Sequence, residues 1–128
     1  MIADTAFIID LGRGDSLAAN KLSELRKRKE AVAITAVTSF EFFQGYGNFN
    51  ERELKMFSRL ISNALIVPID HEEAKLAGMI QSRLRKKGIQ VDALDCLIAG
   101  TVMAGKDILL TRNVKDFSHI EGLKIEIY

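Results

Sequence analysis

Short apolar runs alternate with longer segments of helical period along this 128-residue chain, and no other feature constrains its fold as strongly. The runs have the length of buried strands, and the segments between them are long enough to form crossover helices. This alternation predicts an α/β fold of three layers, in which a central, mostly parallel sheet of about five strands carries helices on both faces. The predicted strands are residues 1–4, 31–35, 65–69, 108–111 and 123–127.

The last predicted strand has a pattern of its own. Leu123, Ile125 and Ile127 alternate with Lys124 and Glu126, which is typical of an edge strand with one face in water.

Four segments between the strands carry apolar residues at helical spacing and have recognisable ends. Asp70 and Glu73 form the start of one helix, which stops at Gly88, and a buried helix rich in small residues ends at Gly105. The predicted helices are residues 16–29, 52–61, 70–88 and 92–104.

Composition limits the class of protein. With 48% hydrophobic residues and a single proline, we expect one compact domain over residues 1–128. The only cysteine, Cys96, excludes an internal disulfide and a cysteine zinc cage. No stretch approaches the roughly 20 apolar residues that a membrane helix needs, and Asp4 stands where a secretion signal would be apolar. We therefore expect a cytoplasmic protein that does not enter a membrane.

Oxygen-bearing side chains follow the predicted strands or open the last long helix. They are Asp4, Glu41, Asp95, Asn113 and Asp116. Ligands of parallel sheets bind at the carboxyl ends of the strands, so these side chains are expected to converge. Clustered carboxylates repel one another unless a cation neutralises them, and oxygen ligands without cysteine or histidine favour Mg²⁺ or Mn²⁺ over zinc. Such ions suit the cleavage of phosphodiesters by an activated water, which is nuclease chemistry.

Two of these acids also have a structural interpretation. Thr38 and Glu41 have the spacing of a capping box, and on the residues alone this is as well supported as catalysis. Asp4 could cap the turn after its strand, although an acid in the apolar stretch from Ile2 to Ile9 favours function.

Asp95 is the strongest functional candidate, because a carboxylate among apolar neighbours is costly to bury without a partner. Asp92, one turn earlier, is interpreted as the helix cap. The remaining aspartates are expected to be caps, turns and surface charges: Asp10, Asp15, Asp70 and Asp107.

With these residues located, almost the whole chain resembles the PIN-domain family. The family's first motif resembles IADTAFIID at residues 2–10, and its second resembles ITAVTSFEFFQG at residues 34–45. Its third resembles LDCLIAG at residues 94–100, and its fourth resembles LTRNVKDF at residues 110–117. Each motif is weak alone, but four in order at typical spacing are a strong match.

The resemblance, to members of the VapC type, implies an Mg²⁺-dependent endoribonuclease, with Mn²⁺ as a substitute, that acts as the toxin of a toxin–antitoxin pair. It implies structured RNA, such as transfer or ribosomal RNA, as substrate. It also implies homodimerisation and inhibition by an antitoxin whose tail enters the acidic groove. The implied catalytic residues are Asp4, Glu41, Asp95 and Asp116, with Asn113 as a further metal ligand. Many members carry aspartate where Asn113 stands, so either the Asn113 carbonyl oxygen or Asp116 completes the site.

An RNA enzyme needs cations to hold the phosphates that its carboxylates repel. Arg112 and Lys115 flank the fourth motif, and with Thr5 and Thr111 they are the expected substrate contacts. The basic runs that end two helices, at residues 26–29 and 83–87, could instead complement the helix dipole, and we favour that role for the first.

Aromatic residues crowd into one ten-residue segment: Phe40, Phe42, Phe43, Tyr46 and Phe49. One short helix seldom buries that much surface, so we expect a partner to cover part of it, preferably an antitoxin helix. Ordinary core packing is the alternative for Phe40 and Phe43.

Two other functions compete with the nuclease. A phosphoacceptor receiver module has a similar layout and would use Asp70 as the acceptor, but it needs paired acids after the first strand, and only Asp4 is present. The other is a PIN fold that has lost catalysis and binds RNA or a protein. Asn113 supports it, because many family members carry aspartate at that position.

Overall fold

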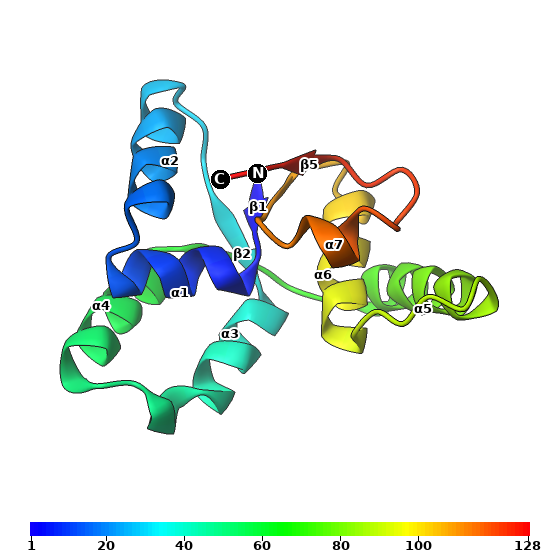
Figure 1. Cartoon of the computed structure of the whole chain (residues 1–128), viewed down its shortest axis with the longest axis horizontal. Helices are drawn as coiled ribbons and strands as arrows, with labels where there is room; N and C mark the ends of the chain where they lie inside the picture. The colour runs from blue at the N-terminus through cyan, green and yellow to red at the C-terminus, as the bar shows by residue number, and fades with distance from the viewer.

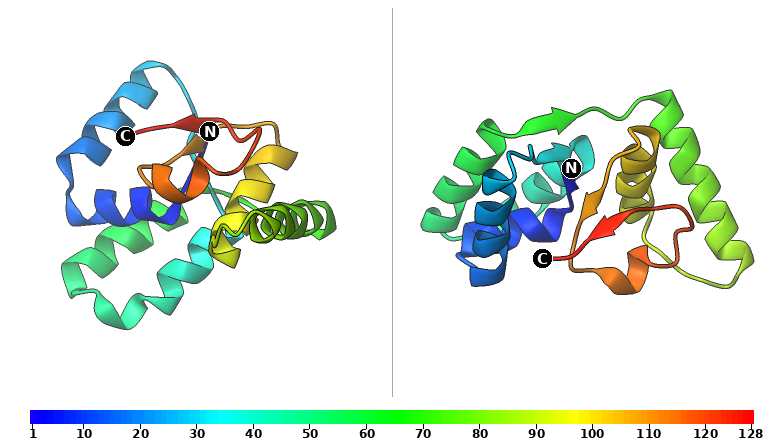
Figure 2. Two further views of the ribbon diagram at one scale, coloured as in Figure 1. Left: turned by 45° about the vertical axis from the view of Figure 1, so that its right-hand side comes forward. Right: turned by 90° about the horizontal axis from the view of Figure 1, so that it is seen from above.

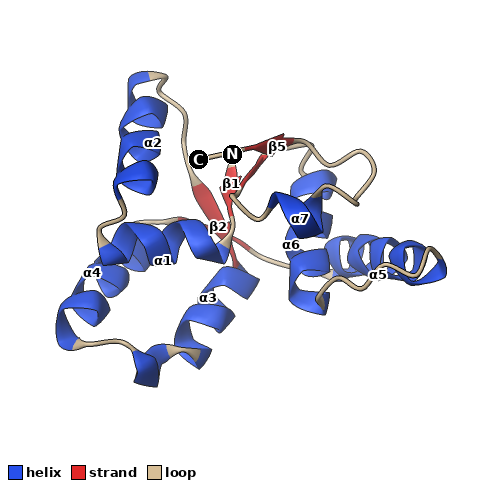
Figure 3. Cartoon of the chain, viewed as in Figure 1, coloured by secondary structure: helices blue, strands red, loops and turns tan.

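Five short parallel strands form the central sheet of the computed structural model, which describes residues 1–128 (Figures 1 and 3). Their order across the sheet is β3-β2-β1-β4-β5. The bounds are Ile2–Ala3 for β1, Ala33–Thr35 for β2, Leu65–Val67 for β3, Leu109–Leu110 for β4 and Ile125–Glu126 for β5. All five lie within the predicted runs, so the predicted α/β fold with a parallel sheet is confirmed.

Seven α-helices connect or flank the strands, and a short 3₁₀ helix, η1, spans Tyr46–Asn48. The α-helices are α1 Thr5–Arg13, α2 Ser16–Lys27, α3 Ala36–Gln44, α4 Glu51–Ser62, α5 His71–Lys86, α6 Ala93–Ala104 and α7 Val114–Phe117. Four of them, α2, α4, α5 and α6, match the predicted helices to within two residues. None of the helices is both long and apolar enough to cross a membrane.

The strands send alternate side chains into two separate cores, which makes the molecule three-layered (Figure 2). Ala3, Ile34 and Leu110 pack with residues of α1, α2, α3 and α4 on one face. Ile2, Ala33 and Leu109 pack with α5, α6 and α7 on the other, so helices cover both faces as predicted.

The edge position predicted for the last strand is confirmed, and on its polar face Lys124 is exposed while Glu126 is partly covered by ion pairs. Glu126 of β5 pairs with Lys21 of α2 and with Arg28, the C-cap residue of that helix, each at 2.8 Å. The alternation therefore reflects one apolar core contact and one ionic contact with a helix.

Candidate active site

Asp4 directly follows β1 and holds the start of α1 in place. Its Oδ1 accepts a hydrogen bond from the backbone N–H of Phe7 at 2.9 Å, and its Oδ2 accepts one from the Thr111 hydroxyl at the end of β4. The carboxylate is buried, with 4% of the residue exposed. Burial raises the pKa of Asp4, the two hydrogen bonds lower it, and the negative charges of Asp10 and Glu41 raise it further. Asp4 is thus both a helix cap and a member of a crowded acidic site.

Glu41 lies on the second turn of α3 and has no capping role. The helix is capped by Thr35, whose hydroxyl accepts from the backbone N–H of Thr38 at 3.2 Å. The capping-box interpretation of Thr38 and Glu41 is therefore wrong, because α3 begins one turn earlier than that motif requires. Glu41 instead accepts a hydrogen bond from the Thr5 hydroxyl through Oε2, which ties it to the first turn of α1.

Asp95 stands in the first turn of α6, after Asp92, which caps that helix through the backbone N–H of Leu94 at 2.8 Å. The cap predicted for Asp92 is confirmed. Burial raises the pKa of Asp95 to about 6, and the charges of Asp92, Glu41, Asp116 and Asp4 add to the shift. No hydrogen bond offsets it, so this carboxylate keeps both oxygens open to a ligand.

The fourth motif brings its two polar side chains together. Asn113 precedes α7, and its side-chain N–H donates to Oδ2 of Asp116 at 3.0 Å. The backbone N–H of Asn113 donates to the Thr111 hydroxyl at 2.9 Å, which links this loop to Asp4. Asn113 thus orients Asp116 and keeps its own carbonyl oxygen available as a neutral ligand.

Three carboxylates from separate segments, Asp4, Glu41 and Asp116, therefore lie close enough to Asp95 for their charges to act on it. Figure 1 shows β1 and β2 ending side by side, where α1 and α3 begin. No three acidic, histidine or cysteine side chains are close enough to hold one ion by themselves. Mg²⁺ needs no such cage, because it usually keeps several waters and binds one or two carboxylates plus substrate phosphate. Asp95, with both oxygens unbonded amid three further acids, fits an ion held in that way.

The expected substrate contacts have different surroundings. Thr111 is fully buried, so it cannot touch RNA, and its observed role is to hold Asp4. Thr5 is part-buried and engaged with Glu41. Lys115 on α7 is exposed, which leaves it accessible to a phosphate.

Arg112 makes a contact that the sequence did not reveal. Its guanidinium forms a bidentate pair with Asp10 of α1, at 3.0 Å and 3.2 Å, and lies over the ring of Tyr128. Only 7% of Asp10 is exposed, so the prediction of a cap, turn or surface role for Asp10 is wrong. The signal was available, because Asp10 follows Phe7, Ile8 and Ile9, the kind of apolar setting that singled out Asp95.

The other aspartates have the local roles expected of them. Asp15 caps α2, and Asp70 caps α5 in a reciprocal capping box with Glu73. Asp107 accepts from the backbone N–H of Ile108 and pairs with the N-terminal amine at 3.0 Å. None of the three belongs to the acidic cluster.

The aromatic segment divides into a buried part and an exposed patch. Phe42 is buried and stacks on Phe49, whereas Phe40, Phe43 and Tyr46 are about half exposed. Core packing of Phe40 and Phe43, the alternative considered above, is therefore wrong. These three residues form an exposed aromatic patch on α3 and η1.

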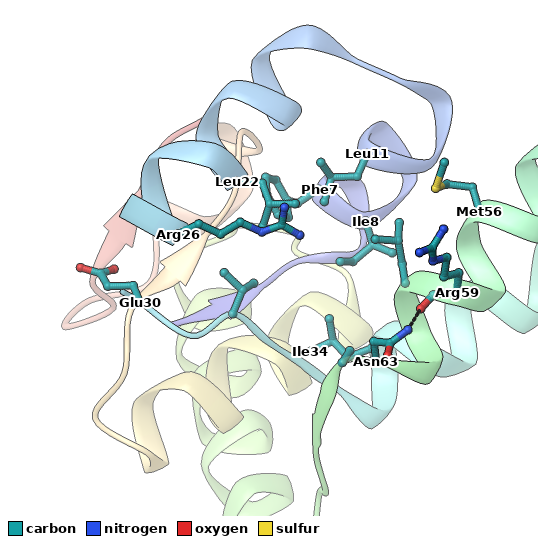
Figure 4. Close-up of a pocket in the computed structure, with 13 residues that line it drawn as sticks. Phe7, Ile8, Leu11, Leu22, Arg26, Glu30, Ile34, Met56, Arg59 and Asn63 are labelled. Carbon is teal, nitrogen blue, oxygen red and sulfur yellow. Dashed lines mark hydrogen bonds between the residues drawn. The ribbon is translucent and has the colours of Figure 1, made fainter. Parts of the chain in front are cut away.

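A second apolar surface lies apart from the acids. A groove of about 580 Å³ runs between α1, α2 and α4 (Figure 4). Nine of its 13 lining residues are hydrophobic, among them Ile8, Leu22 and Met56, and Arg26 and Arg59 add positive charge. None of the four clustered acids lines it.

The acids of this fold gather at the carboxyl ends of its parallel strands, which is where the ligands of such sheets bind. The PIN domain family model matches residues 1–123, so the chain belongs to the PIN-domain family. The chain is 30% identical over 123 residues to ribonuclease VapC19 of Mycobacterium tuberculosis, covering 96% of each protein. It is 27% identical over 126 residues to the tRNA(fMet)-specific endonuclease VapC of Salmonella typhimurium, covering 94% of this chain and 96% of that protein.

A solved structure supports the same fold. The chain superposes with a TM-score of 0.87 and 22% identity on a chain from the crystal structure of VapBC2 from Rickettsia felis, bound to a DNA fragment from their promoter. The match covers 99% of this chain and 97% of that one. With the family established, Asp70 is a helix cap and the receiver module is excluded.

Proposed function

We propose that this chain, acting as a single domain over residues 1–128, is an Mg²⁺- or Mn²⁺-dependent endoribonuclease and the toxin of a toxin–antitoxin pair. The convergence of Asp4, Glu41, Asp95 and Asp116 carries the proposal. The charges of Asp4, Glu41 and Asp116 add to the raised pKa of Asp95, and such an arrangement is unfavourable unless a cation, and through it a phosphate, belongs among them.

The four acids differ in whether their carboxylates accept hydrogen bonds from other side chains. Asp4 is fixed by Thr111, Asp116 by Asn113, and Glu41 by Thr5 through one of its two oxygens. Asp95 has both oxygens open. The metal would supply an activated water and neutralise the leaving oxygen. Asp95 and the second oxygen of Glu41 are the freest groups to hold the ion, and Asp4, Asp116 and the side-chain oxygen of Asn113 would complete its site.

The proposed substrate is structured RNA. The Salmonella relative is named a tRNA(fMet)-specific endonuclease, which makes transfer RNA the first substrate to examine. Exposed Lys115 and half-exposed Arg112 would bind backbone phosphates beside the acids. A cytoplasmic location follows from this substrate.

The proposed protein partners are a second copy of the chain and an antitoxin. Support for partners comes from apolar surface that the chain leaves uncovered, namely the exposed aromatic patch on α3 and η1 and the groove of Figure 4. The Rickettsia felis neighbour is itself a VapBC complex.

Cleavage of total cellular RNA tests the proposal. Wild type, Asp95→Asn and Asp92→Asn would each be incubated with Mg²⁺, with Mn²⁺ and with EDTA. Wild type is expected to give discrete products only with metal, and Asp95→Asn to give none. Asp92→Asn is the matched control, since asparagine caps a helix as well as aspartate does and the variant loses the same charge three residues away.

Cleavage by Asp95→Asn at the wild-type rate would refute the assignment of the site. No cleavage by wild type under any condition, together with no binding of Mn²⁺, would instead favour the catalytically inactive PIN fold that Asn113 suggests.

A further inference from the structure

Three residues far apart in the sequence meet beside the acidic cluster. Arg112 binds both carboxylate oxygens of Asp10, and the Tyr128 hydroxyl donates to Oδ2 of Asp10 at 2.8 Å. The Tyr128 ring packs edge-on against Phe7, with 4.7 Å between centroids, and the Arg112 guanidinium lies 5.9 Å from its centre. The guanidinium is therefore held from one side by a carboxylate and from another by an aromatic ring.

The location of this cluster connects it to the acids. Thr111 and Arg112 are consecutive, and they bind Asp4 and Asp10, which stand at the start and in the middle of α1. Phe7, which contacts Tyr128, also donates its backbone N–H to Asp4. The position of the Arg112 side chain is thus fixed relative to the same helix that carries Asp4.

Arg112 still has donors to offer. A guanidinium has five N–H groups, and one of them donates a hydrogen bond to Asp10, at 3.2 Å. About half of the Arg112 side chain is exposed, whereas the Asp10 side chain is only 10% exposed. A phosphate can therefore reach Arg112 but not Asp10. The contact with Asp10 fixes the orientation of the Arg112 guanidinium and leaves N–H donors free to bind a phosphate.

We propose that Arg112 contacts the RNA backbone and that Asp10 and Tyr128 are positioning residues that aim its guanidinium at the substrate. The inference rests on the proposed function, because the substrate is RNA in both. It makes an unusual prediction: removing the negative charge of Asp10 weakens RNA binding, although removing a bare negative charge near a phosphate would strengthen it.

The test measures the affinity for fluorescein-labelled transfer RNA by anisotropy, with Mg²⁺, in the Asp95→Asn background so that no RNA is cut. Arg112→Gln is expected to raise Kd about tenfold and to reduce the slope of log Kd against log salt by about 0.7–0.9, the contribution of one phosphate contact. Asp10→Asn is expected to raise Kd about threefold. Tyr128→Phe, which keeps the ring contacts with Phe7 and Arg112, is expected to raise it about twofold.

Glu121→Gln is the matched control, because Glu121 is exposed outside the cluster and its loss changes the net charge equally. It is expected to leave Kd unchanged or slightly lower. An Asp10→Asn variant that binds RNA as tightly as its parent, or more tightly, would overturn the positioning role. So would variants of Arg112 and Tyr128 that lower the melting temperature without changing Kd or its salt slope.

The inference and the proposed function can fail separately. Wild type that cuts no RNA, with the predicted changes in Kd intact, contradicts the nuclease and leaves the Arg112 contact standing. Cleavage by wild type with no change in Kd for Asp10→Asn contradicts only the inference.

Discussion

Asp95 is the site residue whose charge is least favourable in the metal-free folded protein. Its carboxylate lies among three other acids of the site and accepts no hydrogen bond, so burial and repulsion together raise its pKa to about 6 from an ordinary 3.8. Without metal, the folded state therefore retains a proton between pH 3.8 and pH 6 that the unfolded chain has released. The free energy of unfolding falls as the pH rises through this window.

Asp95→Asn should remove this penalty while it abolishes cleavage. In EDTA at pH 7 the variant is expected to be more stable than wild type by about 1 kcal/mol, less than the full shift implies because the side chain is partly exposed. Urea unfolding at pH 5, 6 and 7 measures the difference, which should shrink at pH 5. A variant less stable than wild type at pH 7 would mean that Asp95 makes favourable contacts in the folded state.

Thr111 gives a second prediction for a single residue. Thr111→Val removes the hydroxyl that holds Asp4 while the shape of the side chain is kept. Loss of such an outer hydrogen bond typically costs 10–100-fold in activity, which steady-state cleavage of transfer RNA would measure.

Thr101→Val is the control for Thr111→Val, because Thr101 is also buried but donates to the Leu97 carbonyl within α6. Its activity per folded molecule should match wild type. Equal losses in both variants would assign the effect to burial of a hydroxyl rather than to Asp4.

The sequence allowed some site residues to be predicted and concealed others. Asp4, Glu41 and Asp95 could be proposed because Asp4 follows a strand, Glu41 lies in the helix after a strand and Asp95 opens a helix, and a parallel sheet brings such positions to one edge. The partners of Asp10 could not, because Arg112 and Tyr128 stand 102 and 118 residues away and no local pattern connects them. Thr111 was predicted to contact the substrate because its burial, which depends on the packing of β4 against β1, is not visible in the sequence.

At the level of elements, the four longest helices could be predicted but α1 could not. The strand β1 ends at Ala3, and the next residue, Asp4, already caps α1. No turn residues separate β1 from α1, so the boundary between strand and helix cannot be recognised within the apolar stretch that continues to Ile9. The direct passage from β1 to α1 nevertheless matters for the site, because it places Asp4 at the carboxyl end of the strand.

The contact between α5 and α6 is sensitive to a small change at Gly100. A Cβ added at Gly100 of α6 would lie 2.8 Å from the Glu73 carbonyl oxygen and 2.9 Å from the Ala77 nitrogen, both in the backbone of α5. Gly100→Ala is therefore expected to lower the free energy of unfolding by about 1–3 kcal/mol.

Gly78→Ala, on α5, is the matched control. Its Cβ would meet nothing within 4 Å, so alanine should stabilise the helix by about 0.5–1 kcal/mol. Chemical denaturation measures both variants, and a Gly100→Ala protein as stable as Gly78→Ala would show that the two helices are not closely packed.

For the whole molecule, the acidic cluster predicts that metal and stability are linked. An ion that binds only the folded chain stabilises it by about 2.7 kcal/mol at a hundredfold excess over its Kd. At pH 7, Mg²⁺ or Mn²⁺ should raise the melting temperature of wild type by several degrees, and EDTA should reverse the change. In Asp95→Asn the shift should be much smaller, and an equal shift in both proteins would place the ion elsewhere.

The central claim is that water, activated at the acidic cluster, cuts RNA. Its most direct test is cleavage of transfer RNA with Mn²⁺ in ¹⁸O-labelled water, followed by mass spectrometry of the product ends. The account predicts discrete products that carry a linear terminal phosphate with one labelled oxygen, none of them formed by Asp95→Asn. Products that end in a 2′,3′-cyclic phosphate, or labelled products from Asp95→Asn in equal yield, would contradict it.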